Sequence, residues 1–274
     1  MKSPKIRSAV DFAAQVYKRY VAHRVSRRAA EVTYYMLFTL FPFVIFVYSV
    51  LSFLDLPIDE ILDKLIPVLP ANVYELIMEY LTYVGGMSKT FMLYAGSVLA
   101  VYMLYKAITS LNYSVRKASD SPNLKSRNRI IMSLLVSCVM MFAIFALLIL
   151  FSISRNIYHY IALFLELDAW VNLLANIIRY AVGPVFMFFA LSVYYYIMDD
   201  RKVPFKRYML GAGFAIFLWY AFSVAFMIYA NYFGKYTNLY GSLASIMVLM
   251  IWFHTTAASF ILGAEINTVL NKNE

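Results

Sequence analysis

The stretch YGSLASIMVLMIWFHTTAASFILGAEIN, residues 240–267, decides the fold class because it is long and apolar enough to cross a membrane as one helix. A spanning helix needs about 20 largely apolar residues. The stretch nevertheless holds His254 near its middle and Glu265 and Asn267 near its end. An ionisable side chain inside a membrane costs about 2.5–3.5 kcal/mol on insertion scales unless it is paired. These three residues are therefore the first candidates for a functional site.

The composition of the whole chain is typical of a membrane protein. Of its 274 residues, 63% are hydrophobic and 14% are charged, whereas soluble domains have about 45–50% apolar and about 25% charged residues. Aromatic residues make up 18%, which suits rings that lie at headgroup depth. The net charge of +9 does not indicate a nucleic-acid partner, because the basic residues are spread between apolar segments and form no basic domain.

Several segments are apolar and long enough to span a bilayer. Six meet the length requirement: about 30–54, 91–113, 130–153, 173–198, 208–233 and 241–269. None has the strict two-residue alternation of a barrel strand, and each is far longer than such a strand, which has about 10 residues. The sequence therefore predicts an all-α polytopic membrane bundle of six transmembrane helices over residues 29–271.

The distribution of Lys and Arg predicts the orientation of this bundle. The N-terminal segment and the second and fourth loops together hold seventeen Lys and Arg, whereas the first, third and fifth loops hold four. Loops rich in Lys and Arg stay on the cytoplasmic side of a membrane. Both termini are therefore expected in the cytoplasm.

Two segments outside the spans carry helical patterns of their own. Residues 1–28 are basic, and the apolar positions of 9–23 recur at helical spacing, which predicts an amphipathic helix on the anionic cytoplasmic leaflet or a plain topological anchor. Residues 55–89 are acidic and are broken by prolines into two short helical patterns. We expect this second segment to form an amphipathic cap on the outer side.

His254 and Glu265 share one face of the last predicted span. They are eleven residues apart, which places them within about 20° of one stripe and about 16 Å from each other along the axis. They are too distant to touch but could mark one polar path, or each could make a structural hydrogen bond between helices. A carboxylate near a helix C-terminus is disfavoured by the macrodipole, so Glu265 should have a basic partner. The candidates by depth are Arg27, Arg28, Arg116 and Arg201.

Prolines and glycines mark positions where these helices bend or approach closely. Pro42 and Pro184 lie inside the first and fourth predicted spans, where they free carbonyls and kink the helix. Such breaks line cavities in transporters, although kinked helices also occur in purely structural roles. Gly211, Gly213 and Gly241 permit close helix contact.

The sequence lacks the patterns of soluble enzymes. His23, His159 and His254 fall in the cytoplasm, at the outer surface and in mid-membrane of the predicted topology, so they form no metal cluster. There is no P-loop and no GxSxG motif. We expect no catalytic residues, no cofactor, no metal and no ATPase within the chain.

Four stretches carry a resemblance to a known family. RRAAEVTYYMLFTLFP (27–42), LNYSVRK (111–117), RKVPFKRYMLGAGFAIFLW (201–219) and the opening stretch at 240–267 resemble motifs of the BrkB/YihY family of bacterial inner-membrane proteins. The resemblance covers about 20–271, and it implies an inner-membrane location and an envelope function, with export or lipid movement among the suggestions. The residues that carry it are Arg28, Ala29, Tyr34, Tyr35, Pro42, Asn112, Arg116, Pro204, Gly211, Tyr240, Gly241, Ser242, Gly263, Glu265 and Asn267.

Two residues depart from the family pattern, and the family's former name does not fit this chain. Glu31 stands where the family usually has a small apolar residue, and His254 lies in a stretch that is usually more uniformly apolar. The family was once labelled ribonuclease BN, but this sequence has no hydrolytic metal constellation. His254 is therefore particular to this chain rather than part of the shared signature.

These observations favour a transporter that moves a lipid or another anionic amphiphile. In this hypothesis Arg28 and Arg116 contact anionic headgroups at the cytoplasmic rim, and Glu265 and Asn267 pair with them as a gate. In a small-solute or ion transporter, His254 could serve proton coupling. A small-solute or ion transporter and a non-transporting scaffold or regulator are the alternatives. The candidate transport and gating residues are Arg28, Arg116, Glu265, Asn267, His254, Pro42, Pro184, Tyr34, Tyr35 and Gly241.

Overall fold

The structure of the chain is a computed structural model that describes six helices and their immediate ends. The residues described are 9–53, 78–79, 81–82, 89–120, 169–201, 203–233 and 242–272. The predicted span at 130–153 and nearly all of the predicted outer cap at 55–89 lie outside them.

The described residues are helical throughout their regular elements. The helices are α1 (Ala9–Ala22), α2 (Val25–Phe53), α5 (Lys89–Ala118), α7 (Ala169–Met198), α8 (Phe205–Phe233) and α10 (Ser242–Lys272). No strand occurs in this part of the chain, so the predicted all-α class is confirmed for it.

Three of the helices are long and apolar enough to cross a membrane. The qualifying stretches are Val25–Phe53 in α2, Phe205–Ile228 in α8 and Ile246–Asn271 in α10. Helix α5 has 30 residues but is more polar than these. In α7, the part whose side chains the structure describes, Pro184–Met198, is a shorter apolar helix. The described chain is thus that of a helical membrane protein, and the total of six spans stays a prediction.

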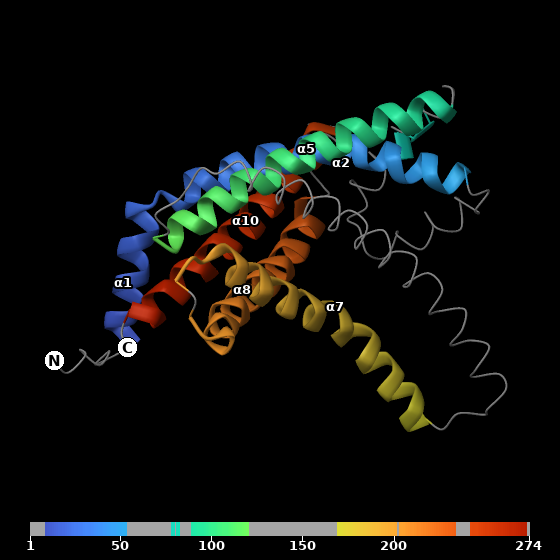
Figure 1. The fold of residues 1–274 in the computed structure, drawn as a ribbon. Helices are drawn as coiled ribbons and strands as arrows, with labels where there is room; N and C mark the ends of the chain where they lie inside the picture. Colours follow the sequence, from blue (N-terminus) through green and yellow to red (C-terminus); the bar gives the residue numbers. More distant parts are fainter. Residues whose placement is uncertain are drawn as a thin grey trace.

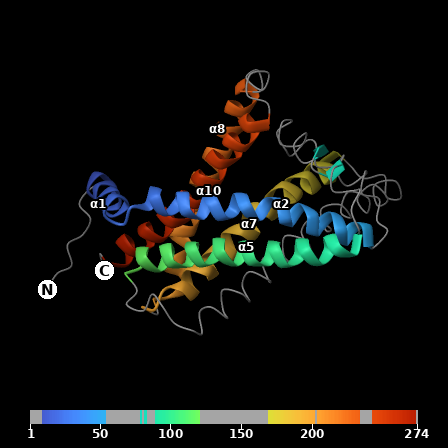
Figure 2. The ribbon, with the colours of Figure 1, turned by 90° about the horizontal axis from the view of Figure 1, so that it is seen from above.

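Helices α2 and α5 run side by side along most of their length, and α10 packs against α8, α2 and α5 (Figures 1 and 2). The α2–α5 contact is close at Gly96, where an added Cβ would lie 2.7 Å from the Ile45 side chain and 3.1 Å from the backbone nitrogen of Phe46. Small residues at such points let helices pack tightly without a hydrophobic driving force from water. Helix α7 completes the group by packing on α8.

Helix α10 supplies residues to both buried apolar clusters. One cluster joins α10 to α2, and its members are Val25, Ala29, Val32, Ala257 and Ile261. The other joins α10 to α5, α7 and α8, and it includes Val115, Tyr195, Tyr208, Ala212 and Ala264. The hydroxyls of Thr256, Ser259 and Thr268 bond carbonyls of α10 itself, four residues earlier. Helix α10 is therefore central to the packing, and its small polar residues are satisfied within it.

The two prolines that the sequence analysis selected lie in continuous helix. Helix α2 runs through Pro42 and α7 runs through Pro184. Both side chains are half-buried. The role of these prolines in lining a cavity stays a prediction.

The charged residues gather where α1 meets the ends of α5, α7 and α10 and the beginnings of α2 and α8 (Figure 1). We call this region the charged end. Its members are Arg19, His23, Arg24, Arg27, Arg28, Arg116, Asp120, Asp199, Asp200, Arg201 and Glu265. The basic N-terminal segment and the beginnings of the predicted second and fourth loops thus lie together, as the predicted topology requires.

Candidate functional site: the charged end of the bundle

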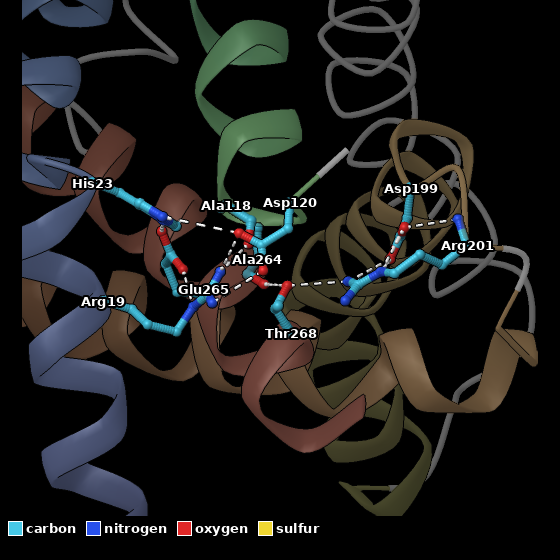
Figure 3. A network of polar contacts seen from close by, with 9 residues as sticks. All are labelled: Arg19, His23, Ala118, Asp120, Asp199, Arg201, Ala264, Glu265 and Thr268. Atoms are coloured by element: carbon cyan, nitrogen blue, oxygen red, sulfur yellow. Dashed lines mark hydrogen bonds and ion pairs between the residues drawn. The ribbon is translucent and has the colours of Figure 1, made fainter. Parts of the chain in front are cut away.

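The carboxylate of Glu265 lies fully buried and is held by two basic side chains from one segment. Arg19 Nε donates a hydrogen bond of 2.7 Å to its Oε2, and His23 Nδ1 lies 2.6 Å from its Oε1 (Figure 3). Arg19 is in the last turn of α1, and His23 follows the end of that helix by one residue. Because residues four apart share a helix face, the two side chains reach the carboxylate together.

Arg19 also joins α10 to the end of α5. Its Nη2 donates to the carbonyl of Ala118 at 2.6 Å, and its Nη1 lies 3.1 Å from Asp120 Oδ2. Ala118 is the last residue of α5, and the macrodipole favours a cation at this end of a helix. Burial opposes the charge and would lower the pKa of Arg19, but hydrogen bonds and charges from Asp120 and Glu265 outweigh it, so the pKa is raised. Arg19 therefore stays charged at every pH that the protein meets.

His23 and Arg28 connect the beginning of α2 to the same cluster. The backbone carbonyl of His23 accepts a 2.9 Å hydrogen bond from Arg28 Nε. The guanidinium of Arg28 lies 4.7 Å from the ring centroid of Tyr113 on α5, which is within the range of a cation–π interaction. Arg28 thus links α2, the end of α1 and α5.

Glu265 does have a basic partner, as the dipole argument predicted, but the four candidates chosen by depth were wrong. The α1 segment occupies both carboxylate oxygens. Arg116 pairs instead with Asp200 beyond α7, and Arg201 pairs with Asp199 at 2.8 Å. The hypothesis that Arg28 and Arg116 pair with Glu265 and Asn267 is therefore not what the structure contains.

Arg201 connects the loop after α7 to α10. Its Nη2 donates to the hydroxyl of Thr268 at 3.1 Å, and that hydroxyl bonds the carbonyl of Ala264, next to Glu265 (Figure 3). Burial would lower the pKa of Arg201, but the hydrogen bond and charge of Asp199 outweigh it and raise the pKa. Two permanently charged arginines therefore flank the end of α10.

Asn267 fixes the contact between α10 and α8. Its Oδ1 accepts a 2.8 Å hydrogen bond from the backbone nitrogen of Gly211, and its Nδ2 donates to the Tyr208 carbonyl at 3.3 Å. A Cβ at Gly211 would overlap both the Asn267 side chain and the carbonyl of Gly263. The two helices can approach this closely only with glycine at these positions.

Two tyrosines of α7 make further links that the sequence analysis missed. Tyr194 donates from its hydroxyl to Asn112 Oδ1 on α5 at 2.7 Å. Tyr195 donates to the Phe260 carbonyl of α10 at 2.6 Å. Nothing in the sequence distinguishes these two rings from the other 22 tyrosines.

Arg19 and His23 were missed although the sequence contains a signal for them. Both lie away from the apolar stripe of the predicted N-terminal helix, and they are four residues apart. Two basic residues at that spacing present one cationic face. Because the whole helix was predicted to lie on the membrane surface, the pairing of Arg19 and His23 with a buried carboxylate was not predicted.

Three other predicted site residues, His254, Tyr34 and Tyr35, do not join the charged end. His254 is half-buried, and it makes no hydrogen bond or ion pair with another described residue. Tyr34 is 54% exposed, and its ring packs edge-on against that of Tyr35. Gly241 lies outside the described residues.

Taken together, the apolar helices and the buried polar links between them define a helical membrane protein, and the ion pairs among its described residues lie at one end. The profile of the family described as Virulence factor BrkB matches residues 16–274. The chain therefore belongs to this family, as the resemblance of its motifs predicted.

Individual relatives are distant. The chain is 29% identical over 268 residues, 97% of each chain, to the ribonuclease-like protein YfkH of Bacillus subtilis. It is 30% identical to a UPF0761 membrane protein of Vibrio campbellii over 87 residues, which are 32% of this chain and 28% of the relative. The corresponding protein of Vibrio parahaemolyticus is 31% identical over 87 residues, with the same coverage. No solved structure matches the chain.

Several of the residues that carry the family resemblance make contacts between elements. Asn112, Arg116, Gly211, Glu265 and Asn267 each contact a residue of another element. Within the described residues, no group of three or more His, Cys, Asp or Glu side chains could hold a metal ion.

Proposed function

We propose that this protein is a transporter without its own ATPase, which moves a lipid or another anionic amphiphile between the leaflets of the bacterial inner membrane. In this proposal α1 is a gate at the cytoplasmic end of the bundle. The observation that carries it is the buried carboxylate of Glu265, whose described partners, Arg19 and His23, both come from the α1 segment.

Helix α1 is attached to the bundle mainly through polar contacts. No side chain described within α1 is fully buried, and Val10, Tyr17 and Val21 are 75%, 69% and 56% exposed. Apolar burial supplies most of the free energy that holds elements together, so α1 gains little from it. Elements with few buried contacts open at the lowest free energies, which makes α1 the described helix best suited to move.

Opening α1 would uncover Glu265 and release the guanidinium of Arg19. Leaving a buried charge without its partner is strongly unfavourable, so the closed arrangement is the default state. An anionic headgroup that takes the place of Glu265 beside Arg19 would reduce this cost. The gate would then respond to the substrate whose charge it recognises.

The direct test is the movement of a labelled phosphatidylglycerol between the leaflets of vesicles that contain the purified protein. We expect the wild-type protein to move it faster than protein-free vesicles do. Glu265→Gln keeps the shape of the side chain but removes the charge that holds α1, so we expect faster movement still. Glu31→Gln is the control, because Glu31 is an exposed carboxylate of α2, and it should behave as wild type. Equal rates for Glu265→Gln and wild type would overturn the gate.

A non-transporting scaffold is the second candidate, because the buried polar residues also connect helices. That function predicts no lipid movement above protein-free vesicles for any variant, while Glu265→Gln lowers thermal stability. A small-solute transporter predicts that the vesicles take up a solute but leave the lipid label in its leaflet.

A further inference from the structure

An open hollow lies at the corner where α1 turns into α2. Its volume is about 460 Å³, and its wall is largely apolar. Arg24, which makes the turn, has a φ of 53°, in the left-handed region. We call this feature the corner hollow; its lining residues are Tyr20, Val21, Arg24, Val25, Ser26 and Arg27.

The two arginines of the corner hollow differ from the other arginines of the charged end. Arg19, Arg28, Arg116 and Arg201 each contact an acceptor or a ring of another residue. Arg24 and Arg27 are exposed, and neither guanidinium has a hydrogen bond or an ion pair to another described residue. The first turn of α2 also holds no acidic residue. Two guanidinium groups that have no hydrogen-bond or ion-pair partner among the described residues therefore belong to the lining of the corner hollow.

The corner hollow lies at the beginning of a candidate membrane span. Val25, in its wall, is the first residue of a candidate span. On α1, the exposed side chains of Val10, Tyr17 and Val21 form one apolar stripe, which is the face that an interfacial helix turns toward lipid. An apolar wall with two guanidinium groups at this depth matches the chemistry of a phospholipid, in which apolar chains and a charged phosphate meet.

We propose that the corner hollow binds an anionic phospholipid. Its phosphate pairs with Arg24 and Arg27, and the beginning of its acyl chains lies against Tyr20, Val21 and Val25. Guanidinium groups bind phosphate oxygens through charge-assisted hydrogen bonds. Because the site has walls from both α1 and α2, a bound lipid would hold these helices at their present angle. This binding does not depend on whether the protein transports anything.

The test is the binding of phosphatidylglycerol to the full-length protein in a neutral detergent, measured by native mass spectrometry and by the lipid-induced rise in thermal midpoint. We expect Arg24→Gln/Arg27→Gln to weaken binding roughly tenfold or more. Each basic residue near a membrane surface contributes to the attraction of an anionic lipid, and this variant removes both guanidinium groups. Lys18→Gln/Lys206→Gln is the matched control. It removes two exposed positive charges at the same end but outside the corner hollow, and it should bind as wild type.

Each alternative outcome decides the question. Equal weakening in the two double variants would show general charge attraction and overturn the site. Glycerol phosphate or inorganic phosphate is also added in place of the lipid. If either raises the thermal midpoint as much as phosphatidylglycerol does, the site binds soluble anions and the proposal of a lipid site is overturned. If the double variant does not fold, Arg27→Gln alone serves, because Arg27 has ordinary helical backbone and an exposed side chain. Unchanged binding by a folded Arg27→Gln protein would also contradict the proposal.

Discussion

At the scale of single residues, one buried carboxylate explains most of the arrangement of the charged end. Glu265 is completely buried, whereas Arg19 keeps 16% of its side chain exposed and Asp120 keeps 36%. A buried ion pair adds little net stability compared with apolar residues of the same shape, but removing one partner leaves an uncompensated charge. The two acidic partners of Arg19 should therefore differ in importance.

Glu265→Ala should lower the free energy of unfolding by about 2–4 kcal/mol, because it removes the fully buried partner that Arg19 and His23 share. Asp120→Asn should cost about 1 kcal/mol or less, because an exposed ion pair is weak. Denaturation of the purified protein in detergent measures both. An equal loss in the two variants would show that burial does not set the strength of these contacts.

A double-mutant cycle should show that Arg19 and Glu265 act on each other directly. With both residues replaced by Leu, the loss of stability should be smaller than the sum of the single losses by about 1 kcal/mol or more. Arg19 and Asp199 form the control cycle, because Arg19 pairs with Glu265 and Asp120 whereas Asp199 pairs with Arg201, and their effects should add. Additive losses for Arg19 and Glu265 would contradict the pairing.

At the scale of elements, the contact of α8 with α10 depends on two glycines and one amide. Gly211 and Gly263 bring the two backbones together, and Asn267 then bonds backbone groups of α8. Gly213, two residues further along α8, is different: an added Cβ there would meet only Phe188, at 3.7 Å. Helix α8 thus contains one glycine in a close contact between helices and, as its control, one glycine with room for a side chain.

Gly211→Ala should destabilise the protein by about 1–3 kcal/mol, the range for forcing an extra methyl group into a packed contact. Gly213→Ala should be neutral or stabilising by up to about 1 kcal/mol, since alanine favours helix over glycine. Thermal unfolding in detergent compares the two directly. Equal stability of both variants would show that α8 and α10 do not approach as closely as described.

Much of this helical arrangement was predictable, because apolar length is a strong signal. Five of the six predicted spans overlap described helices, and the need of Glu265 for a basic partner followed from its place in an apolar helix. The identity of that partner did not follow, because depth along the membrane says nothing about which helix packs on α10. Tyr194 and Tyr195 were unpredictable for the same reason: their hydroxyls matter only once α5, α7 and α10 are neighbours.

At the scale of the whole molecule, basic segments that are far apart in the sequence meet at one end. The alternation of Lys and Arg predicted that the N-terminal segment and the second and fourth loops share a side of the membrane. The described helices bring α1 together with the end of α5 and the beginning of α8 (Figure 1). The side of the membrane on which they lie stays a prediction from charge.

Single cysteines placed at Lys18, Lys117 and Lys206 in a Cys138→Ser background should test this arrangement in cells. All three should resist a membrane-impermeant thiol reagent added from outside and react after the membrane is opened. Lys18 and Lys206 are exposed and Lys117 is half-buried, so these substitutions should preserve the fold. Reaction of any one of them in intact cells would contradict a shared cytoplasmic side.

The central claim is that a charge on α10 holds α1 against the bundle. Hydrogen exchange of the backbone amides, measured in vesicles, tests it most directly, because exchange reports the opening of individual elements. We predict that Glu265→Gln increases exchange in α1 by about tenfold or more while α10 stays protected, and that Glu31→Gln changes neither helix. Exchange in α1 that is the same in Glu265→Gln and in wild type would contradict the account.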